Sequence, residues 1–348
     1  VRKYNSEFRL KHNSEETSSM KILVTGGAGY IGSVVTAELL KAGYEVLVFD
    51  NLSRGHRQAL PHAATLIVGD IADRKSLDLL FKSHAIDAVM HFAALIEVAE
   101  SMKVPELYFR NNSAGTLTLL EAMLAAGVRK FVFSSTAALY GNPERTPIQE
   151  DDKLAPANAY GDSKFLVERM LGWMHEVHGL RYVSLRYFNA SGAARPDLGE
   201  DHSPESHLIP LILKVALGQR PNISIFGTDY PTPDGCCVRD YIHVLDLASA
   251  HLLALDALSQ SSRLIYNLGT GQGFSVLQVI GMARRVTGHP IPAEECPRRP
   301  GDPATLVASA EKIRKELGWK PIHSDLEHIV SSAWEWHRRN PRGFGDKT

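Results

Sequence analysis

Tyr160 and Lys164 stand four positions apart in the segment AYGDSK, a spacing that could bring a phenol and an ammonium group together. If this segment begins a helix, side chains four residues apart project from one face, about one turn apart. An unperturbed phenol titrates at about 10, so it accepts a proton at neutral pH only where a nearby positive charge favours the phenolate. The pair could transfer protons, although from these two residues alone a solvated tyrosine and a solvated lysine are the better interpretation.

A cluster of hydroxyl groups precedes this pair in the segment KFVFSSTAALYG. Ser134, Ser135 and Thr136 end an apolar run that is typical of a buried parallel strand. Ligands of parallel α/β sheets bind at the carboxyl ends of the strands, so we expect these hydroxyl groups to lie at a ligand site. Their presence favours a proton-transfer site over a solvated surface.

A glycine-rich turn follows the first predicted strand in the segment KILVTGGAGYIG. Gly26, Gly29 and Gly32 would allow a tight turn and a close approach of the backbone to a pyrophosphate at the positive end of the next helix. Asp50 ends the second predicted strand, where a carboxylate accepts hydrogen bonds from the ribose of NAD and opposes the 2′-phosphate of NADP. These residues predict NAD as the cofactor. Asp70, which ends the third predicted strand, either contacts the adenine or caps the following helix.

Short β-branched runs alternate with longer amphipathic segments as far as residue 190, including one long helix between DAVMHF and KFVFSS. The alternation predicts right-handed βαβ units and an α/β fold, a Rossmann-like doubly wound parallel sheet with helices on both faces. The later chain is rich in loops and prolines, and there we expect a smaller C-terminal α/β lobe that binds the substrate. The predicted divisions are a disordered leader over 1–19, a nucleotide-binding domain over 20–190 with a segment near 238–258 crossing back, and the lobe over 191–348.

The composition of the 348-residue chain is that of an ordinary globular protein. Its 38 Lys and Arg residues nearly balance 39 Asp and Glu residues, so no overall field would attract nucleic acid or an anionic membrane. No apolar run approaches the roughly 20 residues that span a bilayer. Cys236, Cys237 and Cys296 fit reduced thiols in the cytoplasm better than a disulfide framework. The segment from His175 to His178 has the wrong spacing for zinc, so we expect no metal site.

In order and spacing, the glycine turn, the hydroxyl cluster and the Tyr-x-x-x-Lys pair resemble the extended short-chain dehydrogenase/reductase family. From residue 20 to 336 the chain resembles one branch of that family more closely, the UDP-glucose 4-epimerases. The blocks that carry this resemblance are TGGAGYIGS, HFAA, SSTAALYGNP, YGDSK, LRYFNASGA, GEDH, HLIP, IFGTDYPTPDG, VRDYIHVLDLA, YNLGTGQGFSV and RRPGDPA. The later blocks are the more specific ones, since the first motifs occur throughout the larger family.

The resemblance implies an enzyme that epimerises a UDP-sugar at C4 with bound NAD. By motif, Tyr160 would be the base, Lys164 its cationic partner and Thr136 the catalytic hydroxyl group. Tyr160 would remove the proton from the sugar 4-hydroxyl while hydride passes from C4 to NAD, and hydride would return to the opposite face of the 4-keto sugar. The helical spacing would then place a cation beside the phenol that must lose a proton.

The matching positions supply two sets of expected contacts. The cofactor set is Gly26, Gly29, Tyr30, Ile31, Gly32, Asp50, Asn51, Asp70, Ile71, Phe92, Ala93, Ala94, Asn111, Tyr160, Lys164 and Phe188. The UDP-sugar set is Ser134, Thr136, Tyr160, Asn189, His207, Leu208, Phe226, Arg239, Arg299, Asp302 and Leu306. Core packing explains Phe92 and Phe188 equally well, and surface ion pairs are the alternative for Arg239 and Arg299.

Three positions bear on differences within the family. Leu306 matches the family's sugar-pocket gatekeeper, and its intermediate bulk predicts a preference for hexoses with slow epimerisation of an N-acetylhexosamine. The alternative for Leu306 is simple packing in the core of the lobe. Ile96 and His207 stand where some members carry lysine and asparagine, which the resemblance implies is variation without loss of activity.

Other functions fit the sequence less well. A nucleotide-sugar 4,6-dehydratase needs an additional acid and base directly after Thr136, where this chain has Ala137 and Ala138. A non-catalytic NAD-binding sensor would have little need for three catalytic residues. Epimerases of UDP-pentoses, UDP-uronates or UDP-N-acetylhexosamines are harder to exclude. We therefore expect interconversion of UDP-glucose and UDP-galactose by a cytoplasmic homodimer, with no nucleic acid or membrane partner.

Overall fold

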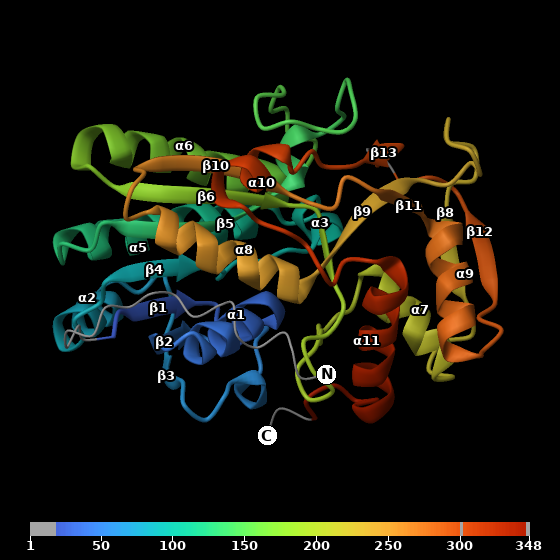
Figure 1. Ribbon diagram of the computed structural model, residues 1–348, viewed down its shortest axis with the longest axis horizontal. Helices are drawn as coiled ribbons and strands as arrows, with labels where there is room; N and C mark the ends of the chain where they lie inside the picture. The colour runs from blue at the N-terminus through green and yellow to red at the C-terminus, as the bar shows by residue number, and fades with distance from the viewer. Residues whose placement is uncertain (1–18, 300–301, 346–348) are drawn as a thin grey trace.

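The computed structural model describes residues 19–299 and 302–345. The leader predicted over 1–19 lies outside the described residues, apart from Ser19. Figure 1 shows a broad sheet with its helices on the left and a smaller lobe with α7, α9 and α11 on the right.

Seven parallel strands form the main sheet of the described chain, in the order β10-β6-β5-β4-β1-β2-β3. They are β1 (Lys21–Thr25), β2 (Glu45–Asp50), β3 (Thr65–Val68), β4 (Ala88–His91), β5 (Lys130–Thr136), β6 (Arg181–Tyr187) and β10 (Arg263–Leu268). The strand order reverses between β1 and β4. In open α/β sheets, ligands bind at such a switch point, beyond the carboxyl ends of the strands.

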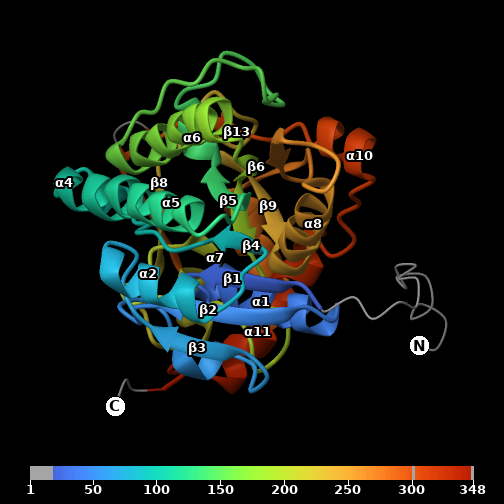
Figure 2. The same cartoon turned by 90° about the vertical axis from the view of Figure 1, so that its left-hand side faces the viewer.

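Helices cover both faces of this sheet (Figure 2). The helices on one face are α1 (Tyr30–Lys41) and α8 (Val244–Ala257), and those on the other are α2 (Arg74–Ser83), α5 (Gly115–Ala125) and α6 (Ala159–His178). Ile22 and Val24 of β1 belong to one core and Leu23 to the other, all fully enclosed. Strands buried on both faces are apolar throughout, which is why they appear as continuous apolar runs. The predicted doubly wound parallel sheet is confirmed.

The long helix predicted between β4 and β5 is divided in the structure. A single turn, α3 (Val98–Ser101), precedes α4 (Pro105–Tyr108), a π-helix η2 (Phe109–Ala114) and then α5. Hydrophobic periodicity alone does not distinguish this π-helix from α-helical turns over a stretch of only six residues. Such turns are frequent at functional sites.

In the part of the chain that the structure describes, the smaller lobe contains two short sheets and three helices around its own apolar core. The strands of the first sheet are β7 (Asn189–Ser191), β9 (Val238–His243), β11 (Gly273–Ser275) and β13 (Thr305–Leu306), and those of the second are β8 (Ile223–Phe226) and β12 (Ala293–Cys296). The helices are α7 (Leu208–Ala216), α9 (Val276–Thr287) and α11 (Leu326–Arg339).

The boundary between the lobes is crossed several times, since α8 and β10 come from the later chain and pack with the main sheet. Because segments of the later chain belong to the main sheet, a single domain boundary between residues 190 and 191 stays a prediction. The remaining elements are η1 (Arg57–Ala59), η3 (Ala137–Tyr140) and α10 (Glu311–Leu317). Among the described residues, no helix combines the length and the apolar character needed to cross a bilayer.

Candidate active site

A cavity of about 1090 Å³ is lined by residues from both lobes. The main sheet contributes the glycine turn after β1, the end of β5 and the first turns of α6, and the smaller lobe contributes parts of β9, β13 and α7. Small-molecule sites usually enclose about 300 to 1,000 Å³, so this cavity could hold an extended ligand or two ligands.

Nearly all of the residues predicted for the site line this cavity or an adjoining pocket that shares part of its wall. The cavity is lined by Gly26, Gly29, Tyr30, Ile31, Gly32, Phe92, Ala94, Ser134, Thr136, Tyr160, Lys164, Phe188, Asn189, His207, Leu208, Phe226, Arg239, Arg299, Asp302 and Leu306. The adjoining pocket adds Asp50, Asn51, Ile71, Ala93 and Asn111.

Asp70 is the predicted contact that lines neither space. Its carboxylate accepts hydrogen bonds from the Asn51 amide at 2.9 Å and from the backbone N–H of Ala72 at 2.8 Å. The alternative role of Asp70 as a helix cap is wrong, because the cap of α2 is Asp73. Asp70 instead orients Asn51, which does line the pocket.

The glycine turn has the close packing that its sequence predicts. Gly26 has a φ of +71°, and a Cβ atom there would come within 2.3 Å of the Ala93 nitrogen. A Cβ atom on Gly32 would come within 2.3 Å of the Gly26 carbonyl oxygen. The turn therefore packs against the end of β4 and leads into α1 at Gly29, where the first N–H groups of the helix face an incoming anion.

Asp50 fixes the turn to the end of β2. One carboxylate oxygen accepts a hydrogen bond from the Ala28 N–H at 2.9 Å, and the other accepts one from the Leu52 N–H at 2.8 Å. The carboxylate is thus held at the wall of the pocket, beside Gly26 and Gly29. A helix N-terminus for a pyrophosphate and a fixed carboxylate for a ribose suit NAD, which the residues present could hold.

Tyr160 lies in the first turn of α6 and lines the cavity. The side chain of Asn158 caps this helix by accepting a hydrogen bond from the Gly161 N–H at 2.8 Å. Burial raises the pKa of Tyr160, and a hydrogen bond with Thr136 opposes that rise. By themselves these residues raise the pKa of Tyr160 instead of lowering it, because burying the phenolate has a larger effect on that pKa than the hydrogen bond with Thr136.

Lys164 follows one turn later and is 2% exposed. Its Nζ donates a hydrogen bond to the Ser134 carbonyl at 3.0 Å and lies 5.0 Å from the centre of the Phe133 ring. Burial lowers the pKa of Lys164 to about 7. The solvated-surface alternative for the Tyr-x-x-x-Lys pair is therefore wrong, since the lysine is enclosed beneath the cavity.

Buried polar contacts hold α6 against its neighbours and so fix the positions of Tyr160 and Lys164. Glu168 accepts a hydrogen bond from Ser135 at 2.6 Å and pairs with Arg186 of β6 at 2.6 Å. Nearer the start of α6, the side-chain amide of Asn112 in the π-helix donates a hydrogen bond to the Ser163 hydroxyl group at 3.1 Å. The sequence analysis missed these residues, because a Glu on a helix and an Arg in a strand carry no local signal of their pairing.

The cationic residues of the smaller lobe are also at the cavity. Arg239 is paired with Asp302, and its guanidinium donates to the Pro303 carbonyl at 2.8 Å. The Arg299 guanidinium lies 4.1 Å from the centre of the Phe226 ring. The Arg239 side chain is only 11% exposed, so an ordinary surface ion pair does not describe it.

Leu306 lies in β13, where it is paired in register with Arg239 of β9. It lines the cavity and also packs against a small apolar cluster that includes Phe188 and Tyr140. Its place in the cavity wall supports the interpretation of Leu306 as a sugar-pocket gatekeeper, and its apolar contacts support the alternative of simple packing in the lobe.

Two further features at the cavity were not predicted. Tyr187 forms a hydrogen bond with Ser134, which fixes a hydroxyl group near Lys164. Four side chains between residues 200 and 207 also gather at the wall, among them His207. Their spacing, E-x-H-x-x-E-x-H, was visible in the sequence but matches no common metal motif.

Known proteins resemble this chain over nearly all of its length. The family described as the NAD dependent epimerase/dehydratase family matches residues 22–269. The UDP-glucose 4-epimerase of Halalkalibacterium halodurans is 55% identical over 327 residues, which cover 93% of this chain and 98% of that protein.

Solved structures agree with these sequence matches. The crystal structure of UDP-glucose 4-epimerase from Brucella ovis in complex with NAD has a TM-score of 0.88 and 44% identity, covering 91% of this chain and 98% of its own. The one from Bifidobacterium longum in complex with NAD+ and UDP has a TM-score of 0.89 and 40% identity, covering 93% of this chain and 100% of its own. With the glycine turn, the enclosed lysine and the tyrosine at one cavity, these matches show that the chain belongs to the NAD dependent epimerase/dehydratase family and, within it, to the UDP-glucose 4-epimerases.

Proposed function

We propose that the protein interconverts UDP-glucose and UDP-galactose by reversible oxidation at C4 of the sugar, with NAD as its bound cofactor. The observation that carries this proposal is a single cavity that brings together the glycine turn, the Tyr160 and Lys164 pair and the arginines of the smaller lobe. The relatives named UDP-glucose 4-epimerase support the same reaction.

NAD supplies the hydride acceptor at C4 and, later in the cycle, the hydride donor. The glycine turn and the N-terminus of α1 receive its pyrophosphate, and Asp50 receives the adenosine ribose. The pocket beside the turn is lined by Asn51, Ile71 and Asn111, which we assign to the adenosine half.

Tyr160 removes the proton from the 4-hydroxyl group and later returns it. Burial raises the pKa of Tyr160, so the phenolate needs positive charge nearby, which Lys164 provides when it is protonated. Thr136 contacts the phenol and holds it in the direction of the sugar. Proton transfer at one oxygen serves both directions of the reaction, because the 4-keto sugar needs only to present its opposite face before it is reduced.

The smaller lobe binds the uridine diphosphate. Arg239 and Arg299 reach the cavity wall, where planar guanidinium groups can each bind phosphate oxygens in pairs. Phe226 offers an aromatic face to the uracil. In the present arrangement Arg239 is satisfied by Asp302 and Arg299 by the Phe226 ring, and we expect both contacts to rearrange when the nucleotide enters.

We further propose that the protein is a cytoplasmic homodimer. Trp173 and Val177, one turn apart on α6, are 68% and 67% exposed, and Met102 near α3 is 62% exposed. Large apolar side chains in such positions suit contact with a second copy. Light scattering of the purified protein should give twice the chain mass, and Trp173→Glu should halve it.

The reaction is tested by incubating the purified protein with UDP-galactose, without added cofactor, and following the sugar anomeric signals by NMR. We expect UDP-glucose to appear, because the cofactor is regenerated in every turnover. A product with a 6-deoxy-4-keto sugar would instead indicate a dehydratase, and an unchanged spectrum from protein that contains NAD would contradict the proposal.

A further inference from the structure

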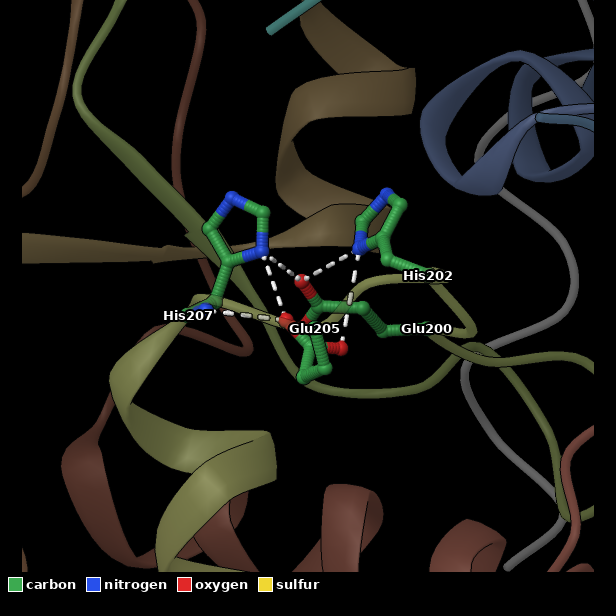
Figure 3. A group of neighbouring side chains, drawn as sticks. All are labelled: Glu200, His202, Glu205 and His207. Carbon is green, nitrogen blue, oxygen red and sulfur yellow. Dashed lines mark hydrogen bonds and ion pairs between the residues drawn. The ribbon is translucent and has the colours of Figure 1, made fainter. Parts of the chain in front are cut away.

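Glu200, His202, Glu205 and His207 converge within one short loop between β7 and α7 (Figure 3). Each histidine turns its Nδ1 atom toward the two carboxylates. One possible ligand atom from each residue can be chosen so that all four lie within 4.8 Å of one another. A group of this kind could hold a cation.

The distances between these atoms resemble those in a tetrahedral metal site. The Glu200 carboxylate lies 3.3 Å from Nδ1 of His202 and 3.1 Å from Nδ1 of His207. The Glu205 carboxylate lies 3.7 Å and 2.9 Å from the same two nitrogens. Zinc bonds to nitrogen and oxygen measure about 2.0 to 2.2 Å, so neighbouring ligands of a tetrahedral zinc lie roughly 3.3 to 3.6 Å apart. Small side-chain movements would therefore complete the geometry.

The enclosure of the cluster points in the same direction. The carboxyl side chains of Glu200 and Glu205 are 6% and 3% exposed and the His202 side chain is 15% exposed, whereas the His207 side chain is 36% exposed. Nδ1 of His202 is screened from solvent and makes no hydrogen bond, although it faces both carboxylates. Burial lowers the pKa of both histidines, but the two carboxylates outweigh it and raise the pKa overall, so imidazolium groups balance the carboxylates in the metal-free protein. A metal ion that binds here would take the place of their protons.

We propose that these four residues form a binding site for a divalent transition-metal ion, with Zn²⁺ as the ion whose preferences they fit best. Once the ion has displaced their protons, two imidazoles and two carboxylates offer the nitrogen and oxygen ligands that zinc accepts, and the two negative charges balance the charge of the ion. Magnesium and calcium suit the site less well, since they favour oxygen ligands alone.

Such an ion would join four residues of one loop at the wall of the cavity. The four ligands span the loop from Glu200 to the N-cap of α7, which is His207. The His202 ring also packs edge-on against Tyr30 at the start of α1, with 6.1 Å between the ring centres. A bound ion would hold this loop in one conformation. Metal binding here does not depend on epimerisation, so each can be tested alone.

The test uses the full-length protein after dialysis against a chelator, with Zn²⁺ added in a calorimetric titration. We expect one Zn²⁺ to bind per chain and Co²⁺ to give the strong visible absorption of a tetrahedral site. X-ray absorption at the zinc edge should show only nitrogen and oxygen neighbours at about 2.0 to 2.1 Å, including imidazole. Sulfur neighbours at about 2.3 Å would place the ion on cysteine and overturn the assignment.

Variants separate this site from adventitious binding. His202→Asn and Glu205→Gln should each weaken Zn²⁺ binding by at least about 100-fold, while His178→Asn, which alters an exposed histidine at the end of α6, should leave it unchanged. Circular dichroism without metal checks that the variants fold, and X-ray absorption of the unaltered protein decides the question if they do not. If no Zn²⁺ binds, or if His178→Asn weakens binding as much as the other two, the cluster is only a set of ion pairs and the proposal fails, whether or not the protein epimerises UDP-galactose.

Discussion

Lys164→Met should stabilise the cofactor-free protein while it impairs catalysis. The structure lowers the pKa of this lysine from 10.5 to about 7 by burial, with no compensating charge among its causes. At about 1.4 kcal/mol per pH unit, this difference corresponds to a cost of roughly 5 kcal/mol for burying the protonated amine. The Ser134 carbonyl would lose its hydrogen bond from Nζ, a loss of about 1 to 3 kcal/mol. The net gain in the free energy of unfolding should therefore be about 2 to 4 kcal/mol at pH 6.5.

The stabilisation by Lys164→Met should depend on pH, in the direction set by the lowered pKa of Lys164. Between pH 7 and 10.5 the unfolded chain holds the lysine proton and the folded chain does not, so the stability of the unaltered protein rises with pH in this window. The cost of burial is fully present below about pH 7 and is lost as the pH approaches 10.5. The advantage of Lys164→Met should therefore shrink steadily over that range.

The assay is equilibrium urea denaturation of the cofactor-free protein at pH 6.5 and 9.5, with Lys82→Met as a control. Lys82 is exposed near the end of α2, so its replacement should change neither the midpoint nor its pH dependence. If Lys164→Met lowers the urea midpoint at pH 6.5, or if its advantage does not decrease at pH 9.5, the lysine is not a desolvated cation and this reasoning is wrong.

Three further predictions concern the proposed roles of single residues. Tyr160→Phe should lower turnover by about 100-fold or more while UDP binding, measured by calorimetry, stays within about threefold, because only the proton acceptor is removed. Asp50→Asn should retain less NAD after purification, because the amide still accepts one hydrogen bond from the turn but lacks the negative charge that faces the ribose. The retained NAD is measured in the extract of the denatured protein, and recovery of mainly NADP from the unaltered protein would contradict the role assigned to Asp50. Leu306→Tyr should suppress epimerisation of UDP-N-acetylglucosamine and Leu306→Ser should increase it, by about 10-fold in either direction. An unchanged ratio of hexose to N-acetylhexosamine turnover in a competition assay would show that Leu306 only packs in the lobe.

Much of this site could be predicted because its signals are local. The glycine turn, Asp50 and the Tyr-x-x-x-Lys pair each lie within one strand or one helical turn, and parallel strands bring their carboxyl ends to one edge. The later chain was harder to interpret, since β7 and β13 are only three and two residues long. Such strands carry too few residues for an alternation of apolar and polar positions to be visible.

Contacts that depend on the path of the chain were not predictable. Glu168 and Arg186 are an ordinary helical glutamate and an ordinary strand arginine until α6 packs beside β6. The π-helix before α5 likewise leaves no trace in the periodicity, although it places Asn112 against Ser163. The helix-cap alternative for Asp70 failed for a related reason, because Asp70 and Asp73 both precede α2 and only the backbone conformation decides which of them is the cap.

The central claim is that one hydride leaves C4 and returns to C4 within the same turnover. It is tested most directly by incubating the protein with UDP-galactose deuterated at C4 in ordinary water and recording the mass of the UDP-glucose formed. We expect the product to keep its deuterium at C4 in full, since the hydride never exchanges with solvent. Product that has lost the label would show that C4 is inverted through proton exchange or elimination, and would contradict the mechanism.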